Sequence, residues 1–177
     1  MPPSQSFAPI SGPDATVLIL GSLPGKRSLE AQQYYAQPQN AFWRIMGELF
    51  DAGPELPYPA RTERLTQHAI ALWDIVASAE RAGSLDSSIV TSSVAVNDFR
   101  GLFQTHGQIE LVCFNGAKAA DLYERQVLPA LDSDFAHIRY ERLPSTSPAH
   151  AAMRFEEKLE RWSIVKSAIE ASEAGAS

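Results

Sequence analysis

Residues 15–20 read ATVLIL, an unbroken apolar run that is followed by Gly21. A run of this kind is typical of a short strand buried on both faces, as in a parallel sheet. Residues 68–76 (HAIALWDIV) and 109–114 (IELVCF) repeat the pattern. In residues 135–143, apolar and polar side chains alternate as in a fourth strand. The sequence therefore predicts four short strands.

Helical patterns separate these strands. Four segments carry apolar side chains at helical spacing: residues 41–50, 99–103, 117–131 and 152–171. Either Asn40 or Gln39 is a suitable N-cap for the first of these helices, and either Asn97 or Asp98 for the second. Strands that alternate with helices predict an α/β fold, in which right-handed crossovers build a parallel sheet. The proline-rich residues 51–62 are expected to be a connection without regular structure.

Length and cysteine content narrow the class of protein. The chain has 177 residues, which favours one domain with a core of its own. Its one cysteine, Cys113, excludes a disulfide framework, a four-cysteine zinc site and a cysteine-ligated iron–sulfur cluster. Cys113 lies in an apolar run and is expected to be a buried, inert thiol. The zinc motif HExxH is absent, and we expect neither a metal nor another cofactor.

The ends of the sequence show no targeting signal. The N-terminal residues have no basic stretch followed by an apolar one, so we interpret residues 1–14 as a flexible lead. Residues 15–172 are expected to form a single domain and residues 173–177 a flexible tail. No apolar run approaches the roughly 18 residues that span a bilayer. We therefore expect a cytoplasmic protein with no membrane contact, associated with the nucleoid if it is bacterial.

Charge is distributed unevenly along the chain. The net charge of −6 argues against a general nucleic-acid coat protein. Two stretches are positively charged instead, because residues 21–47 and 139–154 each carry three basic residues and one acidic residue. We expect Lys26, Arg27, Arg142 and Arg154 to form a local basic face.

Three unusual segments follow predicted strands, namely GSLPG (21–25), FNGAKA (114–119) and LPSTSPAH (143–150). The carboxyl ends of parallel strands meet at one edge of a sheet, where ligands bind. None of the three is a P-loop, a dinucleotide fingerprint or a nucleophile elbow. Between the first strand and the first helix lies a long polar stretch with two adjacent tyrosines. We expect one of these tyrosines to pack in the core and the other to meet a planar ligand.

This combination resembles the uracil-DNA glycosylase superfamily, and most closely its hypoxanthine-DNA glycosylase branch, also called DNA-deoxyinosine glycosylase. The resemblance covers about residues 15–165. It is carried by GSLPGKRSLEAQQYYAQPQNAFW (21–43), LWDIVASAERAGSLDSSI (72–89), NDF (97–99), FNGAKA (114–119) and LPSTSPAH (143–150).

The resemblance implies both a fold and a reaction. The fold is a three-layer α/β/α domain with a central four-stranded parallel sheet. The reaction is base excision in DNA repair: the enzyme flips one deaminated base into a pocket and hydrolyses its N-glycosidic bond. Flipping is required because the bond cannot be reached inside a stacked duplex. The substrate is single- or double-stranded DNA, and we expect a monomer that acts without a cofactor.

Asn40 matches the catalytic asparagine of the hypoxanthine branch. Its amide can donate and accept hydrogen bonds at once, so it can hold a water or bind the departing base. The alternative is that Asn40 serves only as a helix N-cap.

The remaining site residues follow from the same resemblance. Tyr35 is expected to stack on the flipped base through its ring. Asn115 matches a base-reading position but could instead be a turn residue before Gly116. Asp74 could stabilise charge near the sugar or make a buried structural hydrogen bond. The other expected base-binding residues are Gly21, Ser22 and Leu23, and the expected DNA-binding residues are Gly25, Lys26, Ser145, Thr146, Ser147 and His150.

The sequence departs from the superfamily pattern at three positions. Leu23 stands where the mismatch-specific enzymes carry a water-holding asparagine, and Leu143 stands where efficient uracil enzymes carry a histidine. Ser147 takes the place of an inserted leucine and would fill a vacated base position poorly. Three functions stay open: removal of hypoxanthine, removal of uracil or xanthine, and a catalytically silent domain that binds nucleic acid or a protein partner.

Overall fold

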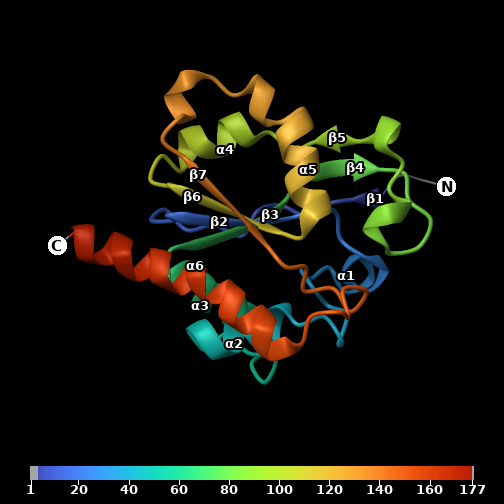
Figure 1. Ribbon diagram of the computed structural model, residues 1–177, viewed down its shortest axis with the longest axis horizontal. Coiled ribbons are helices and arrows are strands. Elements are labelled where there is room, and N and C mark those ends of the chain that lie inside the picture. Colours follow the sequence, from blue (N-terminus) through green and yellow to red (C-terminus); the bar gives the residue numbers. More distant parts are fainter. Residues whose placement is uncertain (1–3, 177) are drawn as a thin grey trace.

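The computed structural model describes residues 4–176, and a four-stranded parallel sheet lies at its centre (Figure 1). Its strands are β2 (Val17–Gly21), β3 (Ile70–Asp74), β6 (Leu111–Asn115) and β7 (Arg139–Leu143), in the order β3-β2-β6-β7. All three pairings are parallel, and Gly21 is in register with Asp74. The predicted α/β sheet is confirmed.

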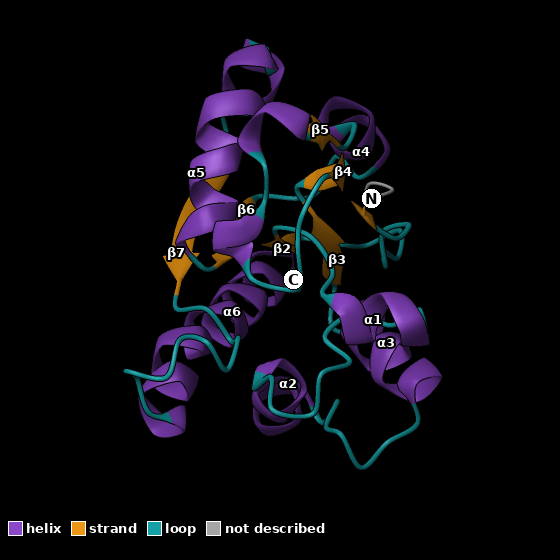
Figure 2. Cartoon of the chain, turned by 90° about the vertical axis from the view of Figure 1, so that its right-hand side faces the viewer, coloured by secondary structure: helices purple, strands orange, loops and turns teal. Residues whose placement is uncertain are grey.

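Helices cover both faces of the sheet, as Figure 2 shows from the side. Helices α4 (Phe99–Thr105) and α5 (Ala117–Gln126) lie on one face. The other face is covered by α2 (Phe42–Phe50), α3 (Tyr58–Gln67) and α6 (Phe155–Ala176). The three-layer α/β/α architecture is therefore confirmed. No helix among residues 4–176 has both the length and the hydropathy of a membrane span.

Alternation along the central strands creates two cores. In β2, Leu18 and Leu20 face the core beneath α4 and α5, whereas Val17 and Ile19 face the core that contains Trp162 of α6. All five residues are almost completely buried. Cys113 belongs to the second core, where burial raises the pKa of its thiol to about 12, so the expected inert thiol is confirmed.

A second, antiparallel sheet was not predicted. It consists of β1 (Ser4–Gln5), β4 (Val76–Ala79) and β5 (Ala95–Val96), in the order β1-β4-β5. The expected strand over residues 68–76 in fact ends at Asp74, and the chain continues after one residue into β4. Strands β1 and β5 are only two residues long, and β4 is buried only at its two ends, so the hydrophobic pattern that marks a central strand is weak.

Two further helices depart from the sequence prediction. Helix α1 (Lys26–Ala31) lies within the expected polar loop, and α3 begins at Tyr58, inside the expected connection. Proline is compatible with a helical first turn, where its missing N–H has no helical acceptor, and Pro59 occupies such a place. Further along the chain, Pro129 interrupts a helix. Helix α5 ends at Gln126, whereas the sequence predicted a helix over residues 117–131. Short 3₁₀ turns occupy Asp86–Ser88, Thr91–Ser93, Leu128–Ala130 and Ser133–Phe135.

The expected lead and tail lie partly within the described residues. Strand β1 pairs with β4, Ile10 bridges to Leu72, and the Phe7 carbonyl accepts a hydrogen bond from the Trp73 indole. Helix α6 extends through Ala176. Residues 1–3 of the lead and residue 177 of the tail lie outside the described part of the chain. The division into lead, domain and tail stays a prediction.

Candidate active site

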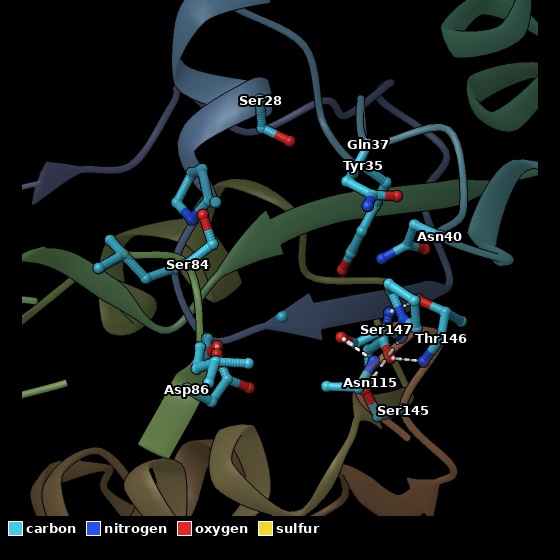
Figure 3. A pocket seen from close by; sticks show the side chains of 18 of the residues that line it. Ser28, Tyr35, Gln37, Asn40, Ser84, Asp86, Asn115, Ser145, Thr146 and Ser147 are labelled. Carbon is cyan, nitrogen blue, oxygen red and sulfur yellow. Dashed lines mark hydrogen bonds between the residues drawn. The ribbon is translucent and has the colours of Figure 1, made fainter. Parts of the chain in front are cut away.

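A cavity of about 880 Å³ opens at the carboxyl edge of the parallel sheet. Every site residue expected from the sequence lines it: Gly21, Ser22, Leu23, Gly25, Lys26, Tyr35, Asn40, Asp74, Asn115, Ser145, Thr146, Ser147 and His150. Figure 3 shows Tyr35 and Asn40 on one side, near Asn115 and Thr146, with Ser84 and Asp86 across from them. The fold thus brings together segments that are far apart in sequence. The roles of these residues are taken up below.

Gly21 forms the floor of this cavity between two polar groups. A Cβ atom at this position would lie 2.7 Å from Asp74 Oδ1 and 2.7 Å from the Tyr35 hydroxyl oxygen. Real Cβ contacts are almost never so short. Glycine here therefore allows the Asp74 carboxyl and the Tyr35 hydroxyl to converge on one point.

Asp74 is a buried carboxyl without a structural hydrogen bond. The residue is 3% exposed, and its Oδ2 atom has no hydrogen-bond partner within residues 4–176. Burial, together with the charge of Asp86, raises the pKa of Asp74 to about 7, although the charge of Arg81 acts in the opposite direction. Unpartnered buried polar atoms are uncommon in proteins and tend to mark functional sites. The structural alternative for Asp74 finds no support among these contacts.

Tyr34 and Tyr35 divide between core and cavity, as expected for a pair. Tyr34 is 4% exposed and donates its hydroxyl to the Ala8 carbonyl at 2.9 Å. Tyr35 has a left-handed φ of 53°, which is strained for a large side chain, and its ring stacks on Phe42 with centroids 4.2 Å apart. Its buried hydroxyl makes no hydrogen bond of normal geometry in the described chain. Burial and the charge of Asp74 raise its pKa, while the nearby Asn115 amide lowers it. The hydroxyl thus belongs to the polar floor, a role that the sequence did not indicate.

Asn40 uses only one end of its amide within the protein. Its Oδ1 accepts a hydrogen bond from the Phe42 backbone N–H at 2.9 Å, which supports the start of α2. The N-cap of α2 is Ala41, so the expectation that Asn40 is the N-cap is wrong by one residue. The amide nitrogen has no hydrogen bond among the described contacts, and Figure 3 shows it directed toward the cavity. Because the amide nitrogen is the end that faces the cavity, Asn40 offers a hydrogen-bond donor to a ligand there.

Thr146 joins three segments of the site. The Asn115 amide donates to Thr146 Oγ1 at 2.9 Å and accepts from the Thr146 backbone N–H at 2.9 Å. The Ala41 N–H donates to the Thr146 carbonyl at 2.9 Å. Strand β6, the loop over residues 143–150 and the start of α2 are thereby locked together. Most of the Asn115 amide is committed to this lock.

Two leucines that depart from the superfamily pattern are parts of the core. Leu23 is 6% exposed, and its carbonyl accepts a hydrogen bond from the buried Arg81 guanidinium. Leu143 is 5% exposed, and its carbonyl accepts from the Gly116 N–H at 3.0 Å. Neither side chain supplies a polar atom to the site.

One wall of the cavity was missed from the sequence. It is formed by residues 84–87 (SLDS), from a serine-rich stretch with no clear periodicity. The Ser22 hydroxyl donates to Asp86 Oδ1 at 2.5 Å, and the Lys26 backbone N–H donates to the Ser84 hydroxyl at 2.8 Å. The wall is thus fastened to the GSLPG segment. Gln37, Ser28 and Lys118 are further lining residues that the sequence did not indicate.

The expected basic face is half wrong. Lys26 and Arg27 line the cavity, but Arg142 pairs with Asp121 and Glu124 on α5, and Arg154 pairs with Glu157. Arg154 pairs with a carboxylate three positions along the chain, whereas the partners of Arg142 are 18 and 21 positions away in sequence.

Replacement of Gly21 tests the floor directly. Gly21→Ala is expected to fold and to lose at least about 10-fold in any reaction at this site, because the added methyl displaces the Asp74 carboxyl and the Tyr35 hydroxyl. Gly107→Ala is the matched control, since nothing lies within 4 Å of a Cβ there. Thermal melts and single-turnover rates of both variants check this, and equal rates would contradict the floor.

The model of the uracil DNA glycosylase superfamily matches residues 9–166, nearly the whole described chain. The chain belongs to the uracil-DNA glycosylase superfamily. Among curated members of the family, a hypoxanthine DNA glycosylase of Methanosarcina acetivorans is 36% identical over 135 residues, which are 71% of this chain and 84% of the relative. A hypoxanthine DNA glycosylase of Methanosarcina barkeri is 36% identical over 118 residues, or 66% of this chain and 73% of the relative.

A solved structure of the family has the same fold. The solution structure of a Methanosarcina acetivorans protein described as a uracil DNA glycosylase superposes with a TM-score of 0.78 at 31% identity. The match covers 95% of this chain and 99% of the other. The sheet and the helix layers are therefore those of the family's fold.

Proposed function

We propose that this protein is a monofunctional DNA glycosylase of base-excision repair that removes hypoxanthine from deoxyinosine. The observation that carries the proposal is the polar floor: Asp74 and Tyr35 converge beside Gly21, and each has a buried oxygen without a protein partner. The names of the relatives, hypoxanthine DNA glycosylases, support the choice of base.

The floor suits a base that leaves with its bonding electrons. Hydrolysis joins a water oxygen to C1′ while the C1′–N9 bond breaks, and the electron pair of that bond stays with the base. Negative charge therefore builds on the base and needs hydrogen-bond donors. The Asn40 amide nitrogen and the Tyr35 hydroxyl are donors, and Asp74 is a third while it is protonated.

Because its pKa is raised, the Asp74 carboxyl can keep its proton and donate a hydrogen bond. A carboxylate can only accept hydrogen bonds, and its charge would oppose that of the departing base. The neutral acid donates, and a buried site that keeps a carboxylic acid neutral near pH 7 is an established way to stabilise a developing anion. We therefore assign the active form to protonated Asp74, with Asn40 as the residue that anchors the base.

Two other functions make different predictions. A uracil or xanthine glycosylase would use the same donors on another ring, because uracil and xanthine also carry a carbonyl beside an N–H. A catalytically silent binding module would have no use for buried donors and acceptors without partners, which cost about 1–3 kcal/mol each. The unpartnered atoms at the floor therefore favour an enzyme over a silent module.

A panel of oligonucleotides tests the proposal. Strands with one deoxyinosine, deoxyuridine or deoxyxanthosine are incubated with the protein, and abasic sites are then cleaved with alkali. We expect the fastest cleavage at deoxyinosine. Faster cleavage at deoxyuridine would assign the uracil function, and retention of all three strands without cleavage would assign the silent module.

We also propose that DNA phosphates are held by Lys26, Arg27 and Lys118, which line the cavity. Binding to duplex DNA weakens with salt by about 0.9 log units per log unit for each neutralised phosphate. Lys118→Gln is expected to lower the slope of log Kd against log salt by about 0.9. The matched control is Arg142→Gln, which is expected to leave it unchanged because Arg142 already pairs with α5 carboxylates. A larger change with Arg142→Gln would mean that DNA lies elsewhere.

Within the same proposal the protein acts as a monomer in the cytoplasm, next to the nucleoid if it is bacterial. Single- and double-stranded DNA with a deaminated base are both proposed substrates. Among the described residues, no three His, Cys, Asp or Glu side chains gather into a metal-binding group.

A further inference from the structure

Leu85 is a large apolar side chain exposed at the edge of the cavity. It is 52% exposed, and only two other large hydrophobic residues of the described chain, Val90 and Leu128, are similarly exposed. Of the three, Leu85 alone lines the cavity. Because its side chain is exposed and lines the cavity, Leu85 is available to contact a ligand that enters the cavity.

The chain on both sides of Leu85 is fastened. Its neighbour Ser84 accepts a hydrogen bond from the Lys26 N–H, and its neighbour Asp86 accepts one from Ser22. The Leu85 carbonyl accepts from the Ser88 N–H at 3.0 Å, which begins the 3₁₀ turn, and Ile89 is buried in the core. Leu85 is therefore held on an anchored wall with its side chain in solvent.

The loop over residues 143–150, on the other side of the cavity, offers only smaller apolar side chains, Pro148 and Ala149. Ser147 is small, and its hydroxyl accepts a hydrogen bond from the Ala149 N–H at 3.2 Å, so it is turned toward its own loop. Figure 3 shows Ser147 beside Thr146, across the cavity from Ser84 and Asp86. Leu85, on the wall over residues 84–87, is therefore the largest exposed apolar side chain that lines the cavity.

We propose that Leu85 inserts into the DNA base stack at the position vacated by the flipped nucleotide. This inference rests on the proposed glycosylase function. Unstacking a base costs a few kcal/mol, and apolar side chains that enter a base step compensate for the lost stacking. Leu85 favours the flipped state of duplex DNA in this way without touching the reacting bond.

The test compares single-stranded and duplex substrates of the same sequence, each with one deoxyinosine. Leu85→Ala is expected to slow single-turnover cleavage of the duplex at least about 10-fold and to leave the single strand within about 2-fold, because only the duplex must be unstacked. Leu85→Met is expected to retain the duplex rate, since Met has a similar volume. Val90→Ala is the matched control, because Val90 is 44% exposed but does not line the cavity.

A second readout follows flipping itself. A 2-aminopurine placed next to the deoxyinosine brightens when its neighbour leaves the stack, and Leu85→Ala is expected to reduce this signal in the duplex. An unchanged duplex rate with Leu85→Ala, an equal loss on both substrates, or a parent protein that cleaves only single strands would each overturn the role of Leu85. A parent protein that cleaves neither substrate would instead overturn the proposed glycosylase function, on which the role of Leu85 depends.

Discussion

Asn40→Ala is expected to cleave a deoxyinosine strand at least about 100-fold more slowly than the parent protein in single turnover. The loss follows from removal of the amide nitrogen, which faces the cavity while Oδ1 supports the start of α2. Leu23 and Leu143 are buried in the core and supply no side-chain donor in its place. DNA binding is expected to persist, because the phosphate contacts lie on other residues.

Asn40→Asp separates the two tasks of this side chain. A carboxylate still accepts the hydrogen bond from Phe42, so its stability is expected to match that of the parent, whereas Asn40→Ala is expected to lose about 1 kcal/mol. The carboxylate has no N–H to donate, so Asn40→Asp is expected to be as inactive as Asn40→Ala. A normal rate in a merely less stable Asn40→Ala would reduce Asn40 to a helix cap and leave Asp74, Asn115 or His150 as candidates.

The single-turnover rate is expected to fall as the pH rises through about 7, because Asp74 loses the proton that it donates to the departing base. Asp74→Asn cannot ionise and keeps both a donor and an acceptor, so its rate is expected to be lower at pH 6 but nearly independent of pH. Rates from pH 5.5 to 8.5 with excess enzyme check this. A rate that rises with pH in the parent and stays flat in Asp74→Asn would assign the active form to the carboxylate.

The same pKa predicts a stability difference with a definite sign. Asp74 titrates near 4 in the unfolded chain and near 7 in the folded protein, so the folded protein binds the proton more tightly. Stability therefore falls as the pH rises from about 4 to 7 and changes no further above that range. Asp74→Asn is expected to raise Tm at pH 8 more than at pH 4, and thermal melts measure this. Equal shifts at the two pH values would show that burial does not perturb this carboxyl.

The central sheet could be predicted because its strands are buried on both faces. Runs such as residues 15–20 leave no polar face, and the turn residues that follow them mark the ends. The antiparallel sheet could not be predicted in the same way, since β1 and β5 are two residues long and partner a strand far away in sequence. Helix α3 was missed because prolines that end a helix elsewhere are tolerated in its first turn.

The candidate site could be predicted as a set of residues but not as a set of contacts. Parallel strands bring their ends together, so Gly21, Asp74 and Asn115 had to meet. The lock between Asn115 and Thr146 and the fastening of Asp86 to Ser22 join residues 31 and 64 positions apart, and no local pattern records them. For the same reason the side-chain pattern did not reveal the wall over residues 84–87 or the unpartnered atoms at the floor.

Release of the free base is the direct test of whether this protein is a hypoxanthine-removing DNA glycosylase. A deoxyinosine oligonucleotide is incubated with excess protein, and hypoxanthine and the abasic strand are quantified together by liquid chromatography with mass detection. We expect the protein to release one hypoxanthine for each abasic strand. Release by Asn40→Ala is expected to be at least about 100-fold slower than release by the parent protein. An intact strand with no free hypoxanthine, or release by Asn40→Ala at the rate of the parent, would contradict these expectations.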